Sequence, residues 1–160
     1  MLSAALILSL VPTGTFPALS ASQLKELRTT KQNVYLPGHV PKGMKANVNV
    51  EVSKEDKTQT YYQVTYTLGK SKFTIQSASE GIGDVFLEDD KGNGLESAYQ
   101  KVKTKPFGEV EIEFDKKTKR QFIVNWIEMP KKQMPRYIAM FGSDISLETA
   151  KKIIASVRRA

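Results

Sequence analysis

Apolar and polar residues alternate with a period of two over much of this 160-residue chain. Successive side chains of a β-strand point to opposite faces, so this alternation is typical of antiparallel strands with one face on a core and the other in water. It predicts strands in the segments 48–52, 62–68, 73–76, 110–114, 122–127 and 137–141. The sequence therefore predicts a domain built mainly on an antiparallel sheet.

The C-terminal segment has the spacing of an amphipathic helix. Ser146 is a favourable N-cap, and Glu148 lies in the positively polarised first turn. Apolar residues then recur on one face and basic residues on the other, as Ala150, Ile153, Ile154 and Val157 against Lys151, Lys152 and Arg158. The predicted fold class is α+β, a curved antiparallel sheet packed against this C-terminal helix.

Other segments are less clearly patterned. Residues 35–44 contain two prolines and two glycines and predict an extended entry with turns. Residues 79–94 are rich in glycine and predict a loop. Residues 95–105 fit either a helix or a strand, and the pattern does not separate the two.

Residues 1–21 contain no Lys, Arg, Asp or Glu. The apolar run Ala4–Val11 fits the core of a signal peptide, about 7–15 residues, and is shorter than the roughly 18 of a membrane span. Small residues place the expected cleavage after Ser20 or Ala21. The alternative is that this segment is a buried strand or helix of the domain. The predicted organisation is a signal peptide at 1–21, a linker or short helix at 22–33 and a single α+β domain at 34–160.

Composition narrows the possible chemistry. The absence of cysteine excludes disulfides, thiolate metal sites and cysteine nucleophiles, and in an exported protein it favours a bacterial origin. The formal net charge of +7 favours an anionic envelope surface as a partner. The alternative is that lysine only keeps the surface soluble.

The domain resembles a family of small uncharacterised bacterial exported domains. The residues that carry this resemblance lie between positions 34 and 158, in 36–44 (LPGHVPKGM), 73–76, 81–84, 125–126, 137–142 and 145–157. The resemblance implies an α+β fold and an exported location, and it implies no activity and no site residues.

Candidate catalytic and metal-binding residues are few. His39, the single histidine, lies in a Pro/Gly-rich turn without a partner at a recognisable spacing. A carboxylate set favours either a calcium site or a polar turn, and it comprises Glu80, Asp84, Glu88, Asp89, Asp90 and Asn93. The row Glu109, Glu111 and Glu113 is interpreted as the solvated face of a strand. No catalytic, cofactor-binding or metal-binding residue is assigned, and no cofactor is expected.

Basic residues gather in two turns, at 116–120 and at 131–136. Because a single strand separates these turns, they should lie at opposite ends of the sheet. No compact phosphate-binding patch is predicted, and nucleic acid is not expected as a partner.

Three functions remain open. The first is a non-enzymatic exported or periplasmic domain, monomeric and without a permanent membrane span, that binds an envelope protein or an anionic envelope surface. The second is a carrier or sensor of an apolar or anionic ligand, held between sheet and helix in a cavity lined by Tyr62, Tyr66, Phe73, Trp126 and Ile153. The third is an enzyme that uses carboxylates of the 80–90 loop.

Overall fold

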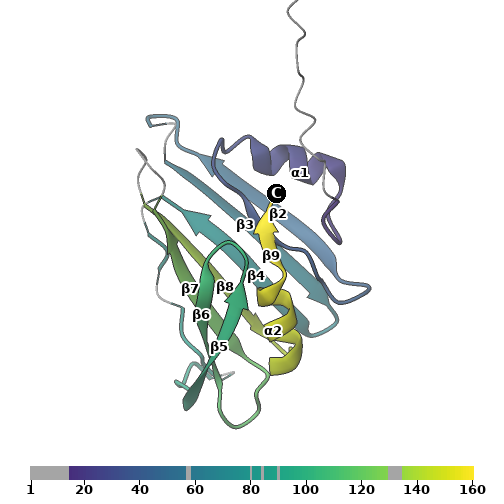
Figure 1. The fold of residues 1–160 in the computed structure, drawn as a ribbon, viewed down its shortest axis with the longest axis vertical. Coiled ribbons are helices and arrows are strands. Elements are labelled where there is room, and N and C mark those ends of the chain that lie inside the picture. The colour runs from purple at the N-terminus through teal and green to yellow at the C-terminus, as the bar shows by residue number, and fades with distance from the viewer. Residues whose placement is uncertain (1–14, 57–58, 80, 84, 90, 130–134) are drawn as a thin grey trace, which may run out of the picture.

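The computed structural model describes residues 15–160, except for 57–58, 80, 84, 90 and 130–134 (Figure 1). The elements are α1 (Ala21–Arg28), β1 (Tyr35–Pro37), β2 (Lys45–Val52), β3 (Thr60–Leu68), β4 (Ser71–Ala78), β5 (Ser97–Thr104), β6 (Gly108–Asp115), β7 (Phe122–Glu128), β8 (Arg136–Ser143), α2 (Leu147–Ala155) and β9 (Val157–Arg159). Seven strands form one sheet in the order β2-β3-β4-β8-β7-β6-β5, and β1 pairs with β9. The predicted α+β class with an antiparallel sheet is confirmed.

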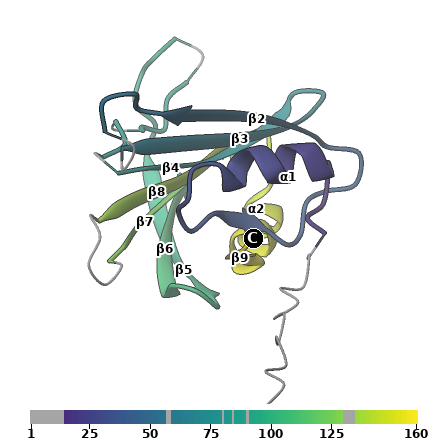
Figure 2. The same cartoon turned by 90° about the horizontal axis from the view of Figure 1, so that it is seen from above.

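The large sheet consists of two runs of consecutive antiparallel strands. Strands β2 to β4 form one run and β5 to β8 form the other. They are joined where β4 pairs with β8, from Lys72 opposite Ser143 to Ala78 opposite Tyr137. In Figure 2, α1, α2 and the β1–β9 pair lie on one side of this sheet. We call that side the inner face and the opposite side the outer face.

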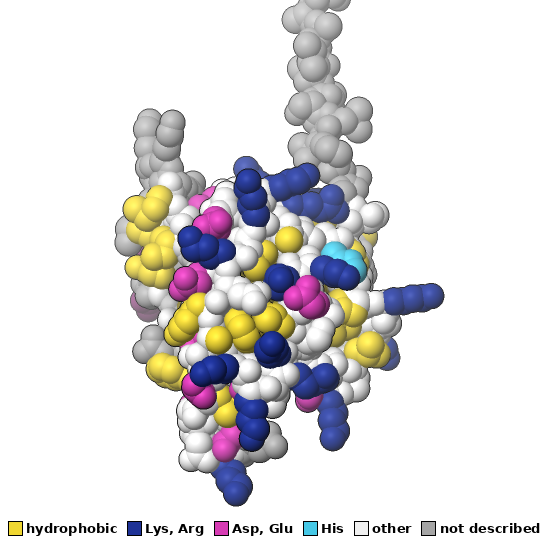
Figure 3. Space-filling model, turned by 60° about the horizontal axis from the view of Figure 1, so that its bottom comes forward, with side chains coloured by type: hydrophobic (Ala, Val, Ile, Leu, Met, Phe, Trp, Pro, Cys, Tyr) yellow, Lys and Arg dark blue, Asp and Glu magenta, His cyan; other side chains and the backbone are white. Residues whose placement is uncertain are grey.

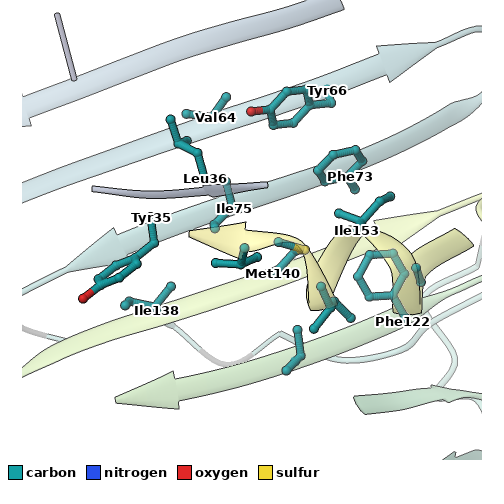
Figure 4. Close-up of a cluster of buried hydrophobic side chains, with 14 of the residues drawn as sticks. Tyr35, Leu36, Val64, Tyr66, Phe73, Ile75, Phe122, Ile138, Met140 and Ile153 are labelled. Carbon is teal, nitrogen blue, oxygen red and sulfur yellow. The ribbon is translucent and has the colours of Figure 1, made fainter. Parts of the chain in front are cut away.

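The predicted alternation places the core residues on the inner face. In β3, Tyr62, Val64 and Tyr66 are fully buried, and between them lie half-buried polar residues. Figure 4 shows side chains from β1 and α2 meeting those of the sheet, with Leu36 and Ile153 among them. Both belong to the same hydrophobic cluster as the β3 residues. The hydrophobic cluster therefore includes side chains of the sheet, of α2 and of the β1–β9 pair.

Local signals explain both helices. Ser20 and Gln23 form a capping box at the start of α1, and the Gln23 side chain also donates to the Ala46 carbonyl of β2, 2.9 Å away. The expected short helix or linker at 22–33 is thus a helix as far as Arg28. At the start of α2 the Ser146 hydroxyl accepts from the Thr149 amide, as its N-cap role predicts.

The C-terminal helix is shorter than predicted. It ends at Ala155, and Val157, which was expected on its apolar face, lies in β9 opposite Pro37. Val157 is still buried, because pairing with β1 holds it against the core. The helical spacing did not predict this change, because a buried Val157 is compatible with a helix and with a strand.

Residues 95–105, which fitted helix or strand equally, contain strand β5. Every residue from Ser97 to Thr104 pairs with β6. The pattern of this segment is ambiguous by itself, and pairing with β6 favours the strand. Lys101 lies opposite Glu111 and Lys103 opposite Glu109, and opposite charges on paired strands are favourable. Strand β8 is the central strand of the sheet, and β7 lies next to it, third from the β5 edge.

The N-terminal residues that the structure describes are folded onto the domain. Phe16 is 5% exposed and belongs to the core cluster. The Arg158 guanidinium lies 4.7 Å from the centre of its ring, and Arg158 Nη2 donates to the Thr15 carbonyl. The apolar run at 4–11 lies outside the described residues, so the signal peptide stays a prediction. The packing of Phe16 places the start of the folded domain before the expected cleavage point.

Candidate functional site

The pairing between β6 and β7 stops partway along both strands. It covers three residue pairs, from Ile112 opposite Val124 to Phe114 opposite Phe122. Beyond Ile112, β6 continues to Gly108 in pairing with β5, and β7 continues to Glu128 in pairing with β8. The two strands therefore diverge at this end of the sheet.

A groove of about 540 Å³ occupies the space between the diverging strands. It is lined by Tyr35, Pro106, Phe107, Glu109, Val110, Glu111, Asn125, Trp126, Ile127, Glu128 and Met129. Consecutive residues of each strand contribute, although their side chains point to opposite faces. Because the lining residues of both strands lie beyond their last ladder pair, we call the groove the β6–β7 slot.

Three aromatic rings form the inner wall of the slot. Phe107, in the β5–β6 turn, lies between Tyr35 and Trp126, with ring centroids 4.7 Å and 5.0 Å away. Tyr35 and Trp126 are buried, and Phe107 is half-buried. Tilted aromatic pairs at such distances are favourable, so the row holds the tip of the β5–β6 hairpin against the core. This position of the tip accounts for the divergence of β6 from β7.

Glu128 fixes the deep end of the slot. Its Oε1 accepts hydrogen bonds from the Tyr35 hydroxyl at 2.7 Å and from Asn33 Nδ2 at 2.5 Å. Burial, the hydrogen bond to Glu128 and the Glu128 charge together raise the pKa of Tyr35 to about 12. The backbone of Tyr35 is held in turn by Tyr62, whose hydroxyl accepts from its amide and donates to its carbonyl.

Alkaline titration tests this arrangement. In the wild-type chain we expect Tyr35 to ionise near pH 12, read as the ultraviolet difference between the wild type and Tyr35→Phe. The raised pKa means that its contribution to stability is present below pH 10.0 and is lost between pH 10.0 and about 12. In Glu128→Gln the pKa of Tyr35 should fall toward 10.0, because the negative charge is gone. An unchanged pKa would place the Tyr35 hydroxyl away from Glu128.

The outer rim of the slot carries negative charge. Glu109 and Glu111 are exposed on β6, two residues apart, which in a strand corresponds to about 7 Å. Glu109 forms an ion pair with Lys101, 2.8 Å away, and both side chains are more than half exposed. An exposed pair of this kind contributes about 0.2–1 kcal/mol, so a competing cation can displace Lys101 at low cost.

Two buried polar atoms at the slot have no hydrogen-bond partner among the described residues. They are the Trp126 indole nitrogen and Glu128 Oε2. Trp126 is 8% exposed and lines the slot. A buried donor and a buried acceptor without partners cost free energy, so both favour the entry of a hydrogen-bonding ligand.

The five residues expected to line a ligand cavity between sheet and helix lie in one hydrophobic cluster. Tyr62, Tyr66, Phe73 and Ile153 are fully buried there, and the Tyr66 and Phe73 rings stack with centroids 4.5 Å apart. Of the five, Trp126 lines the β6–β7 slot and also a smaller pocket of about 340 Å³ on the outer face. The expected cavity itself stays a prediction.

The carboxylates of the 80–90 loop are described only in part. Glu80, Asp84 and Asp90 lie outside the described residues. Asp89 accepts from the backbone amides of Lys91 and Asn93 and from the Asn93 side chain, which lowers the pKa of its carboxyl group. These bonds form a polar turn. Within the described residues, no three His, Cys, Asp or Glu side chains are grouped to hold a metal ion.

The other candidates are scattered. His39 is exposed, and its backbone amide donates to Ser156 Oγ. The basic turn at 116–120 precedes β7, whereas Lys131 and Lys132 of the second basic turn lie outside the described residues. Arg136 is buried at the start of β8, where its Nη2 donates to Thr60. Figure 3 shows basic side chains spread among acidic and hydrophobic ones over one face of the domain.

None of the helices in the described residues is long and apolar enough to span a membrane.

Sequence reasoning missed most of the slot. Tyr35 was assigned to an extended entry, Phe107 was not singled out, and Glu128 was not considered. One signal was present: Phe107 is a large aromatic residue in the short turn at 105–107, which indicates that the turn packs against something. Its partners Tyr35 and Trp126 are distant in sequence, so the pattern alone does not identify them.

Comparison with known proteins adds little. No family model and no curated protein matches the chain, so the resemblance to uncharacterised exported domains stays a prediction. A solved structure with some similarity is the crystal structure of MucB in complex with MucA(peri), at 13% identity and a TM-score of 0.38. The match covers 78% of this chain and 36% of that chain, so this chain spans about a third of its length. A TM-score of this size supports no argument about function.

Proposed function

We propose that the chain is a non-enzymatic exported domain that binds a cationic segment of an envelope protein in the β6–β7 slot. The observation that carries this proposal is the composition of the slot. It joins three aromatic rings to the carboxylates of Glu109, Glu111 and Glu128 on a chain whose net charge is +7. The charged residues that line the slot are thus all acidic, whereas the whole molecule is basic.

The combination of aromatic rings and carboxylates favours a cation as ligand for two reasons. Glu109 and Glu111 present exposed carboxylates, which attract a basic side chain. Aromatic rings attract a cation through their electron-rich faces, by about 0.5–2 kcal/mol. The partly exposed ring of Phe107 and the two rim carboxylates therefore favour a lysine or arginine side chain as ligand.

The carrier function has less support. We infer that the sheet curves around α2, and the complete burial of Tyr62, Tyr66 and Ile153 supports a filled core between them. A close-packed core leaves no room for a ligand without displacing side chains. The Glu109–Lys101 ion pair likewise supports a charged binding rim rather than a neutral acid for catalysis.

Trp126 allows a direct test. It is the single tryptophan of the chain and lines the slot, so its fluorescence emission reports binding there. We expect hexalysine to change this emission saturably. The double variant Glu109→Gln/Glu111→Gln should bind hexalysine about tenfold more weakly, because two charge interactions of up to about 1 kcal/mol each are lost.

The matched control is Glu148→Gln, which removes an exposed carboxylate on α2, away from the slot. It should leave the affinity for hexalysine unchanged. If Glu148→Gln and the double variant weaken binding equally, or if hexalysine does not bind, the slot is not a cation site.

A further inference from the structure

The position of the β6–β7 slot matters as well as its charge. It lies where the ladder between β6 and β7 would continue if the two strands stayed paired. Residues Glu109, Val110 and Glu111 line it together, and so do Asn125, Trp126 and Ile127. Both stretches lie beyond Ile112 and Val124, the last pair of the ladder between β6 and β7. The slot therefore covers the positions where the ladder bonds between these strands would otherwise lie.

We propose that the ligand is an extended polypeptide segment whose main chain pairs with these two strand edges. This inference rests on the proposed function and specifies its ligand. The described ladder between β6 and β7 ends at Ile112 and Val124, so the facing amides and carbonyls beyond it have no strand partner there. An extended peptide satisfies such groups, as in other cases of strand addition, whereas a small cation does not.

The dimensions of the slot suit a short strand. Three residues of β6 line it, and so do four of β7 together with Met129, the residue that follows this strand. At about 3.3 Å per residue, these stretches correspond to roughly 10–16 Å, the length of a segment of three to five residues. The partner segment is thus short, and main-chain pairing supplies a large part of its affinity.

The walls of the slot define a sequence preference. Side chains of the inserted segment alternate between the faces of the sheet. Those on the outer side meet Glu109 and Glu111, which favour basic residues two positions apart. Those on the inner side meet Phe107 and Trp126, which favour apolar residues. The preferred pattern is basic–apolar–basic–apolar–basic.

Four probes test this inference with the full chain. The first is the acetylated, amidated peptide Lys-Val-Lys-Val-Lys. The second and third are the same peptide N-methylated at its valines or at its lysines, so that each lacks the amide donors of one edge. The fourth is spermine, a cation without a peptide backbone. Affinity is read from Trp126 emission, and amide hydrogen exchange is followed at 108–111 and 125–128.

We expect the parent peptide to bind and to slow exchange in both stretches. Each N-methylated peptide should bind at least about tenfold more weakly, because two or more hydrogen bonds of about 1 kcal/mol are lost. Spermine should bind weakly and protect neither stretch. If only one methylated peptide is weakened, the segment pairs with a single edge, and insertion between the strands is wrong.

Failure of this inference can be told apart from failure of the proposed function. Equal affinity for all four probes, without amide protection, would leave the slot as a cation site and overturn main-chain pairing. If none of the four binds, both proposals are wrong. Weakening of the parent peptide by Glu109→Gln/Glu111→Gln, and not by Glu148→Gln, ties the observed binding to the slot.

Discussion

Replacement of Gly142 by alanine should lower the free energy of unfolding by about 3 kcal/mol, at the upper end of typical overpacking costs. An added Cβ would lie 2.6 Å from Phe122 Cε1, 2.8 Å from the Lys72 carbonyl oxygen and 2.8 Å from Phe73 Cβ. Gly142 pairs with Phe73 on one side and with Phe122 on the other. Two of the three contacts involve atoms fixed to the main chain, so the strands themselves would have to move.

The measurement is urea unfolding followed by circular dichroism. Gly83→Ala is the matched control, because an added Cβ there meets no atom within 4 Å, and its effect should stay within about 0.5 kcal/mol. Equal stability of the two variants would mean that β4, β8 and β7 are less closely packed around Gly142 than described.

Removal of residues 15–21 should have an effect of similar size. A chain that begins at Ser22 loses the buried Phe16 ring and the Ser20 cap of α1. Loss of a buried Phe side chain costs about 3–5 kcal/mol and loss of an N-cap about 1 kcal/mol. Compared with a chain that begins at Thr15, we expect unfolding free energy to fall by about 4 kcal/mol.

Phe16→Ala in the longer chain separates the ring from the cap and should account for most of the loss. Sequencing of the N-terminus of the protein isolated from cells then shows which form exists there. Equal stability of the two chains would mean that residues 15–21 are dispensable, and cleavage after Ser20 or Ala21 would be compatible with a stable domain. A large loss would require any cleavage to occur before Phe16.

Much of the sheet could be predicted because its information is local. The alternation in β6 placed Val110, Ile112 and Phe114 in the core, and all three are buried. The slot could not be predicted in the same way, because it depends on where a ladder stops. That point depends on Phe107 packing between Tyr35 and Trp126, which are far from it in sequence. Alternation in a strand shows which face is buried but not how far the strand stays paired.

The β1–β9 pair also determines how the domain would respond to mechanical load. Tyr35 lies opposite Arg159, so the outward ends of both strands lead toward the ends of the described chain, and the Ala160 amide donates to the Val34 carbonyl. A force applied through the two chain ends would separate this pair one bond after another, as in unzipping, once the preceding N-terminal segment has peeled away. Because Tyr35 is part of the aromatic wall of the slot, tension between the two chain ends would dismantle the slot before it reached the large sheet.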